Sequence, residues 1–133
     1  MILLDTSVLV DADLSSLDPA ESYAASILSR AELEFGVAVA PEDARFGRRA
    51  RLEFLDAAID WLPFDEESSR SYGTLARAMH AGAPAQARRT DTFIAAQAHR
   101  HGVPLMTRNA RDFQRVASLV AILTWPPPDA DPE

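Results

Sequence analysis

The chain of 133 residues contains no cysteine and no lysine, so all thirteen of its basic side chains apart from histidine are arginines. Without cysteine there is no disulfide, no thiol nucleophile and no cysteine-ligated zinc or iron–sulfur site. Without lysine there is no Schiff-base chemistry and no P-loop. Response-regulator receivers and haloacid-dehalogenase phosphatases are excluded as well, because both place a lysine beside their acids. The Gly-x-Ser-x-Gly elbow of Ser-His-Asp hydrolases is also missing.

Long hydrophobic runs are missing too. No apolar run approaches the roughly 20 residues that cross a bilayer. The chain start has no basic segment and reaches an acid at Asp5, unlike a signal peptide. With 47% hydrophobic and 25% charged residues, the composition is that of an ordinary soluble, cytoplasmic protein. We expect one domain over residues 1–125 and a proline-rich, acidic, flexible tail over residues 126–133.

Charge is divided unevenly along the chain, whose net charge is −7. Residues 1–67 hold fifteen acids and five arginines, whereas residues 68–128 hold eight arginines and two acids. The net negative charge of the chain argues against nonspecific binding of nucleic acid through overall charge. The arginine-rich half can still form a local surface that faces phosphates.

Short apolar segments alternate with segments of helical periodicity. Strands are expected at residues 2–4, 23–28, 61–64, 103–107 and 119–123. The longer helices are expected at residues 29–39, 41–60, 66–81 and 89–101, with Pro41 at the first helical position and Asp65 as a cap. This alternation predicts an α/β fold of three layers, α/β/α, around a mostly parallel sheet of four to five strands.

Four acids map to the carboxyl ends of the predicted strands, where ligands bind in such sheets. Asp5 ends the first strand, and Glu32 lies near the start of the helix after the second. Asp91 opens the helix before the fourth strand, and Asp112 follows that strand. Four converging carboxylates repel one another unless a cation neutralises them. Ligands that are all oxygen atoms point to Mg²⁺ or Mn²⁺.

Three of these acids also have purely structural interpretations, which the sequence leaves open. Ser29 and Glu32 match a capping box, in which each side chain satisfies the other's backbone N–H. Asn109 and Asp112 match an N-cap followed by an acid in the first turn. Asp91 at the start of a helix interacts favourably with the helix dipole.

Asp5 is the acid that is hardest to explain by structure alone. It comes directly after a buried apolar run, where an unpaired charge costs about several kcal/mol. We therefore expect Asp5 to have a functional role in addition to any structural role.

Four segments, in order and at ordinary spacing, resemble the motifs of the PIN domain. They are Met1–Val10 with Asp5, Ser29–Gly36 with Glu32, Arg88–Ala98 with Asp91, and Thr107–Phe113 with Asp112. The resemblance covers nearly the whole chain. Within the family, a single domain of this length most resembles VapC, the toxin of type II toxin–antitoxin pairs.

The resemblance implies a metal-dependent endoribonuclease that uses Mg²⁺, with Mn²⁺ as a possible substitute. Asp5 and Asp91 are then the expected direct metal ligands, and Glu32 and Asp112 complete the catalytic acidic cluster. A metal-activated water would attack the phosphodiester in line and leave 5′-phosphate and 3′-hydroxyl ends. Hydrogen-bonding residues beside the cluster are expected to be Thr6, Ser7, Thr107 and Asn109.

The resemblance also implies partners: an RNA substrate, a VapB-type antitoxin and a second copy in a homodimer. Candidate RNA-facing residues are Arg88, Arg89, Arg108 and Arg111. A basic side chain of the antitoxin would compete with the cation at the acids. The apolar stripes of helices 41–60 and 66–81 serve either the core or an antitoxin or dimer interface.

Two other functions compete with this interpretation. One is a PIN fold used for assembly without catalysis, and the other is a PIN ribonuclease in housekeeping RNA maturation. The presence of all four acids favours an enzyme over the assembly module.

Overall fold

The structure is a computed structural model, and it describes residues 1–81 and 89–127. Its centre is a five-stranded sheet in the order β3-β2-β1-β4-β5, with every pairing parallel. The strands are β1 Ile2–Leu4, β2 Tyr23–Ser26, β3 Asp60–Leu62, β4 Leu105–Thr107 and β5 Ile122–Thr124. The predicted parallel sheet is confirmed, and β1 occupies its middle.

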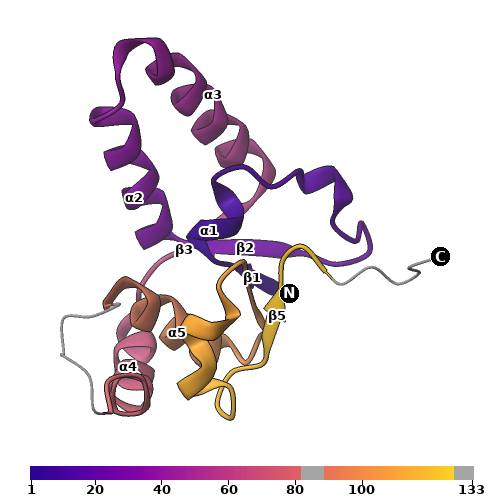
Figure 1. The fold of residues 1–133 in the computed structure, drawn as a ribbon. Coiled ribbons are helices and arrows are strands. Elements are labelled where there is room, and N and C mark those ends of the chain that lie inside the picture. Colours follow the sequence, from indigo (N-terminus) through magenta and orange to yellow (C-terminus); the bar gives the residue numbers. More distant parts are fainter. Residues whose placement is uncertain (82–88, 128–133) are drawn as a thin grey trace.

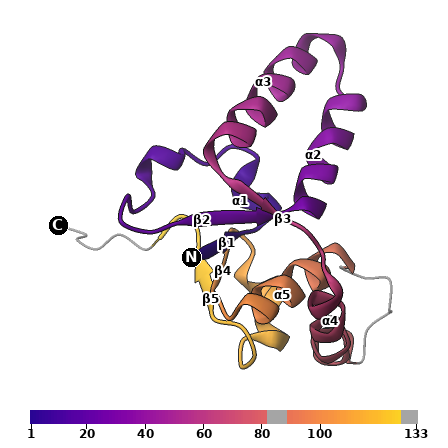
Figure 2. The same cartoon turned by 180° about the vertical axis from the view of Figure 1, so that it is seen from behind.

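Helices pack on both sides of this sheet (Figure 1). They are α1 Thr6–Leu9, α2 Ile27–Ala38, α3 Glu42–Ala58, α4 Glu66–Met79 and α5 Arg89–His101, with two 3-10 segments, η1 Leu14–Ser16 and η2 Ala110–Val116. Figures 1 and 2 show α2 and α3 as a long hairpin on one side, whereas α4 and α5 lie together on the other. No described helix is long and apolar enough to span a membrane.

Neighbouring residues of β1 face opposite layers, because side chains alternate along a strand. Leu3 is fully buried in a cluster with side chains of α4, α5 and η2. Leu4 is fully buried in the cluster on the other face, with Val8 and Leu9 of α1 and Leu55 of α3. The predicted three-layer α/β/α architecture is therefore confirmed.

The apolar stripes of α3 and α4 are part of this core. Leu52 and Leu55 of α3 are buried, and so are Leu75 and Met79 of α4. Core packing therefore accounts for these four side chains of the two stripes. On α3 the exposed large apolar side chains are Phe46 and Phe54.

The junction between β2 and α2 differs from the prediction. The strand ends at Ser26, whose hydroxyl caps the helix by accepting the backbone N–H of Leu28 at 2.9 Å. Ser29 thus lies inside α2 and is fully buried. The capping-box interpretation of Ser29 and Glu32 is wrong, because Ser26 takes the cap where the pairing with β1 and β3 ends.

Other boundaries shift by one to three residues. Pro41 is the N-cap of α3 and not its first helical residue, and α3 ends at Ala58 because Asp60 already pairs with β2. The last strand begins late because the backbone N–H groups of Leu119 and Val120 bond to Val116 in a turn. The remaining strands are shorter than expected, at residues 60–62 and 105–107.

Two predicted helix ends are confirmed. Asp65 caps α4 by accepting the backbone N–H of Ser68 at 2.8 Å. Gly102 follows the last residue of α5 with φ 65°, a left-handed conformation that favours glycine. The predicted tail at residues 126–133 lies, from residue 128 onward, outside the described residues.

Candidate active site

Asp5 lies at the carboxyl end of β1 and is 4% exposed. Its Oδ2 accepts hydrogen bonds from the hydroxyls of Ser7 at 2.7 Å and Thr107 at 2.8 Å. Its backbone N–H bonds to Met106 of β4 at 2.9 Å. Two hydroxyls thus compensate the buried charge and hold the carboxylate at the junction of β1 and β4. Among the described residues, no donor bonds to the other oxygen, Oδ1.

Glu32 lies on α2 with an exposed side chain. The Thr6 hydroxyl donates to Glu32 Oε1 at 2.7 Å, and it is also hydrogen-bonded to the buried Ser29 hydroxyl at 2.7 Å. Because Thr6 directly follows Asp5, the two carboxylates belong to adjoining hydrogen-bond networks. The structure brings Asp5 and Glu32 to the same edge of the sheet, as the sequence predicts.

Asp112 lies in the first turn of η2, shortly after β4. Its backbone N–H bonds to the carbonyl of Asn109 at 2.9 Å, but the Asn109 side chain forms no cap bond. The backbone N–H of Asn109 bonds to Thr107 Oγ1 at 3.0 Å, the same hydroxyl that donates to Asp5. Asp112 is therefore tied to the Asp5 network through the backbone of this turn, and not through a cap by Asn109.

Asp91 lies in the first turn of α5 and is half-buried. The helix packs against α2, which carries Glu32, and against η2, which carries Asp112. Within residues 1–81 and 89–127, no three aspartate, glutamate or histidine side chains are grouped so that they could hold a metal ion. The metal-ligand roles of the four acids therefore remain predictions.

The donor chemistry nevertheless fits a hard cation. Asp5 Oδ1 and Glu32 Oε2 accept no hydrogen bond from the described part of the chain. Carboxylate oxygens are the ligands that Mg²⁺ and Mn²⁺ prefer. Each of these two acids thus keeps one oxygen available for a ligand.

The arginines proposed to face RNA differ in their surroundings. Arg108 is bound to the site, because its guanidinium donates to the Ser7 carbonyl at 3.0 Å and to Asp11 at 2.7 Å. Arg89 and Arg111 are exposed, and neither forms an ion pair with a described carboxylate. Arg88 lies outside the described residues. The sequence pointed to Ser29 only as half of a capping box and as the start of a motif, and its buried hydrogen bond to Thr6 was not predicted.

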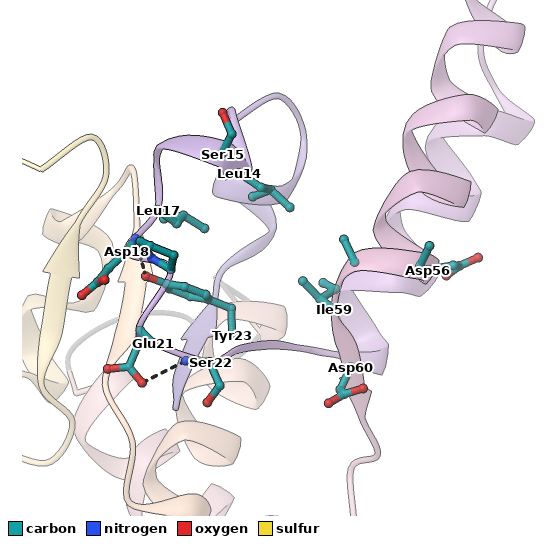
Figure 3. A pocket seen from close by; sticks show the side chains of 13 residues that line it. Leu14, Ser15, Leu17, Asp18, Glu21, Ser22, Tyr23, Asp56, Ile59 and Asp60 are labelled. Atoms are coloured by element: carbon teal, nitrogen blue, oxygen red, sulfur yellow. Dashed lines mark hydrogen bonds between the residues drawn. The ribbon is translucent and has the colours of Figure 1, made fainter.

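A separate cavity of about 550 Å³ lies at the opposite edge of the sheet (Figure 3). Tyr23 and Asp60, the first residues of β2 and β3, line it. Two of its carboxylates are in ion pairs: Asp56 pairs with Arg30 at 2.9 Å, which lowers the pKa of Asp56, and Glu21 pairs with the N-terminal ammonium at 3.0 Å. The cavity is remote from the Asp5 edge and does not belong to the candidate active site.

Comparisons with known proteins agree with this geometry. The PIN domain family model matches residues 2–119. VapC ribonuclease Y4jK of Sinorhizobium fredii is 36% identical over 96% of this chain and 99% of its own. VapBC-5 from Mycobacterium tuberculosis superposes with a TM-score of 0.73 at 30% identity, over 92% of this chain and 94% of that one. VapBC-1 from nontypeable Haemophilus influenzae superposes with a TM-score of 0.74 at 25% identity, over 94% and 98%. The chain therefore belongs to the PIN-domain family, in its VapC branch.

Proposed function

We propose that this protein is a VapC-type endoribonuclease, which hydrolyses RNA phosphodiester bonds as the toxin of a toxin–antitoxin pair. One observation carries the proposal: a buried carboxylate, Asp5, is held by Ser7 and Thr107 at the carboxyl edge of a PIN-fold sheet. A ribonuclease is the named activity of the VapC relative that matches almost the full chain. The proposed site of action is the cytoplasm, where cellular RNA is found.

The residues proposed to hold a metal ion are Asp5, Glu32, Asp91 and Asp112. With Mg²⁺ or Mn²⁺ held there, the site would be supplied with an activated water and with positive charge to offset what develops on the phosphoryl group. The chain's own contribution is orientation. Ser7 and Thr107 bind one oxygen of Asp5 and leave the other available, and Thr6 does the same for Glu32. Such outer partners fix the geometry of ligating carboxylates.

RNA and antitoxin are the proposed partners. Arg89 and Arg111 are exposed cations without described acidic partners, on the two elements that also carry Asp91 and Asp112. They are suited to contact RNA phosphates near the acids. The VapBC structures among the relatives support a VapB-type antitoxin as the protein partner. A homodimer stays a prediction.

The proposal is tested by RNA cleavage with purified, antitoxin-free protein. Total cellular RNA and several folded RNAs are incubated with Mg²⁺ or Mn²⁺, and in parallel with EDTA. We expect cleavage that EDTA abolishes, and a loss of at least about 100-fold in Asp5→Asn and Asp91→Asn. Asp18→Asn is the matched control, because Asp18 lines the cavity at the opposite edge.

Two results would contradict the proposal. Equal cleavage by wild type and Asp5→Asn would assign the activity to a contaminant. No cleavage of any RNA by folded, metal-loaded protein would favour the non-catalytic assembly module. A thermal unfolding scan of each variant separates loss of activity from loss of the fold.

A further inference from the structure

A hollow of about 510 Å³ lies directly beside Glu32, between α2 and α5. Its walls are Leu28, Ala31, Glu32 and Phe35 from α2, with Thr90 and Phe93 from α5. Thr90 immediately precedes Asp91. The hollow therefore opens between the two helices that carry Glu32 and Asp91, and Glu32 belongs both to it and to the Thr6 network.

Two aromatic rings dominate its lining. Phe35 is 67% exposed on α2, three residues after Glu32 and so on the same helical face. Phe93 is only half-buried, and its ring is held in place by a stack on Tyr72 at 4.6 Å and an edge contact with Phe64 at 5.1 Å. The hollow thus presents one free ring and one immobilised ring to solvent.

The polar groups of the hollow are few. Among the described residues that line it, Glu32 is the single ionisable one. The Thr90 hydroxyl forms no hydrogen bond with the described residues, so it is available to a ligand as donor or acceptor. An apolar lining with two aromatic rings and a free hydroxyl suits a flat, heteroaromatic group with polar edges.

We infer that this hollow binds one unpaired base of the RNA substrate, that of a nucleotide flanking the scissile phosphate, with Phe35 as its stacking partner. The inference rests on the proposed function. A phosphodiester held at the acids places its neighbouring nucleotides beside Glu32, and the hollow begins at that residue. Every base offers a face for stacking, and aromatic side chains bind single-stranded RNA in this way.

The continuity with the acids favours a base over a protein side chain as the occupant. A base in the hollow is covalently joined to the phosphate being cleaved, so the interaction contributes directly to binding and positioning of the scissile bond. Phe35 then binds and positions the nucleotide beside the cleavage site and takes no part in bond breaking.

The test uses a cleavage site mapped by sequencing the 5′ ends of products from a single-stranded RNA pool. Short RNAs containing this site are made with the natural bases. In parallel RNAs, an abasic nucleotide replaces one nucleotide at a time, either the one just before or the one just after the scissile bond. Values of kcat and KM are measured for wild type, Phe35→Ala and Phe35→Trp. Phe46→Ala is the matched control, because Phe46 is 84% exposed on α3 and does not line the hollow.

In wild type we expect one abasic position to reduce kcat/KM by about 5- to 150-fold. Phe35→Ala should lose a similar factor on intact RNA, mainly through KM, and should lose little more at that abasic position. Phe35→Trp should keep the difference in kcat/KM between intact and abasic RNA. Phe46→Ala should behave as wild type. This non-additivity is the signature of a direct interaction between ring and base.

The inference is overturned if wild type cleaves RNA but tolerates every abasic position. It is also overturned if an abasic position reduces kcat/KM by the same factor in Phe35→Ala as in wild type. It is also overturned if Phe35→Ala cleaves normally but resists inhibition by the cognate antitoxin, because the hollow would then be a protein-docking site. Failure of wild type to cleave any RNA is a different result, and it removes the proposed function together with this inference.

Discussion

The Thr107 hydroxyl donates to Asp5 Oδ2 at 2.8 Å, across 102 residues of sequence. Both residues are buried at the carboxyl ends of adjacent strands, β4 and β1. The bond joins the first predicted motif of the chain to the last, and it depends on the parallel pairing of these two strands. The same hydroxyl accepts the backbone N–H of Asn109 at 3.0 Å and so fixes the turn that leads to Asp112.

Thr107→Val removes this hydroxyl and keeps the shape of the side chain. We expect a loss of about 10- to 100-fold in RNA cleavage, because Asp5 loses one of its two orienting donors. The free energy of unfolding should fall by about 1–3 kcal/mol, because the Asn109 N–H also loses its acceptor. Cleavage assays and urea unfolding measure the two effects. Thr107→Ser retains the hydroxyl and should keep most of the cleavage activity and most of the free energy of unfolding. If it does not, the role of the hydroxyl is refuted.

Glu32→Gln tests an acid that the fold does not need. The Glu32 side chain is exposed and accepts a single described hydrogen bond, from Thr6. We expect the free energy of unfolding to change by less than about 0.5 kcal/mol, whereas cleavage falls by at least about 10-fold. Glu53→Gln, an exposed acid on α3, is the control for a general effect of charge. Parallel losses of activity in both variants would exclude a specific role for Glu32.

Arg51 joins the α3 side of the hairpin to the end of α1. Its guanidinium donates to the carbonyls of Leu9 at 2.9 Å and Ala12 at 2.8 Å. Arg51→Met should lower the free energy of unfolding by about 1.5–3 kcal/mol, because two carbonyls lose a charged donor. Urea unfolding gives the value, and Arg77→Met, on the exposed face of α4, should change it little. An unchanged free energy of unfolding in Arg51→Met would show that water replaces the guanidinium at both carbonyls.

Acid pH should weaken the start of α4. The backbone N–H and hydroxyl of Ser68, together with Arg100, hold the pKa of Asp65 well below its ordinary value of 3.8. A depressed native pKa contributes stability in full above pH about 4, and the contribution is lost progressively as pH falls toward the native pKa. The difference in unfolding free energy between wild type and Asp65→Ala should therefore be largest at pH 5–7 and shrink at pH 3 and below. A difference independent of pH would refute the role of the charge.

Local signals predicted much of the fold, because they act within a few residues. The apolar run before Asp5 formed the central strand, Asp65 capped α4, and Gly102 follows the end of α5. The predicted boundaries were wrong where two nearby residues could each play the same local role. Ser26 and Ser29 can both cap a helix, and the pairing of β2 with its neighbours decided for Ser26.

The sequence by itself determined the order of strands and helices and the placement of Asp5, Glu32 and Asp112 at one edge of the sheet, because apolar periodicity and the parallel βαβ rule suffice for both. Only the tertiary structure decided the partners of those acids. Hydroxyl bonds from Thr107 to Asp5 and from Thr6 to Glu32 require side chains that are distant in sequence to meet at angstrom precision. The hollow between Phe35 and Phe93 likewise exists only because α2 and α5 pack side by side, and no local pattern encodes that contact.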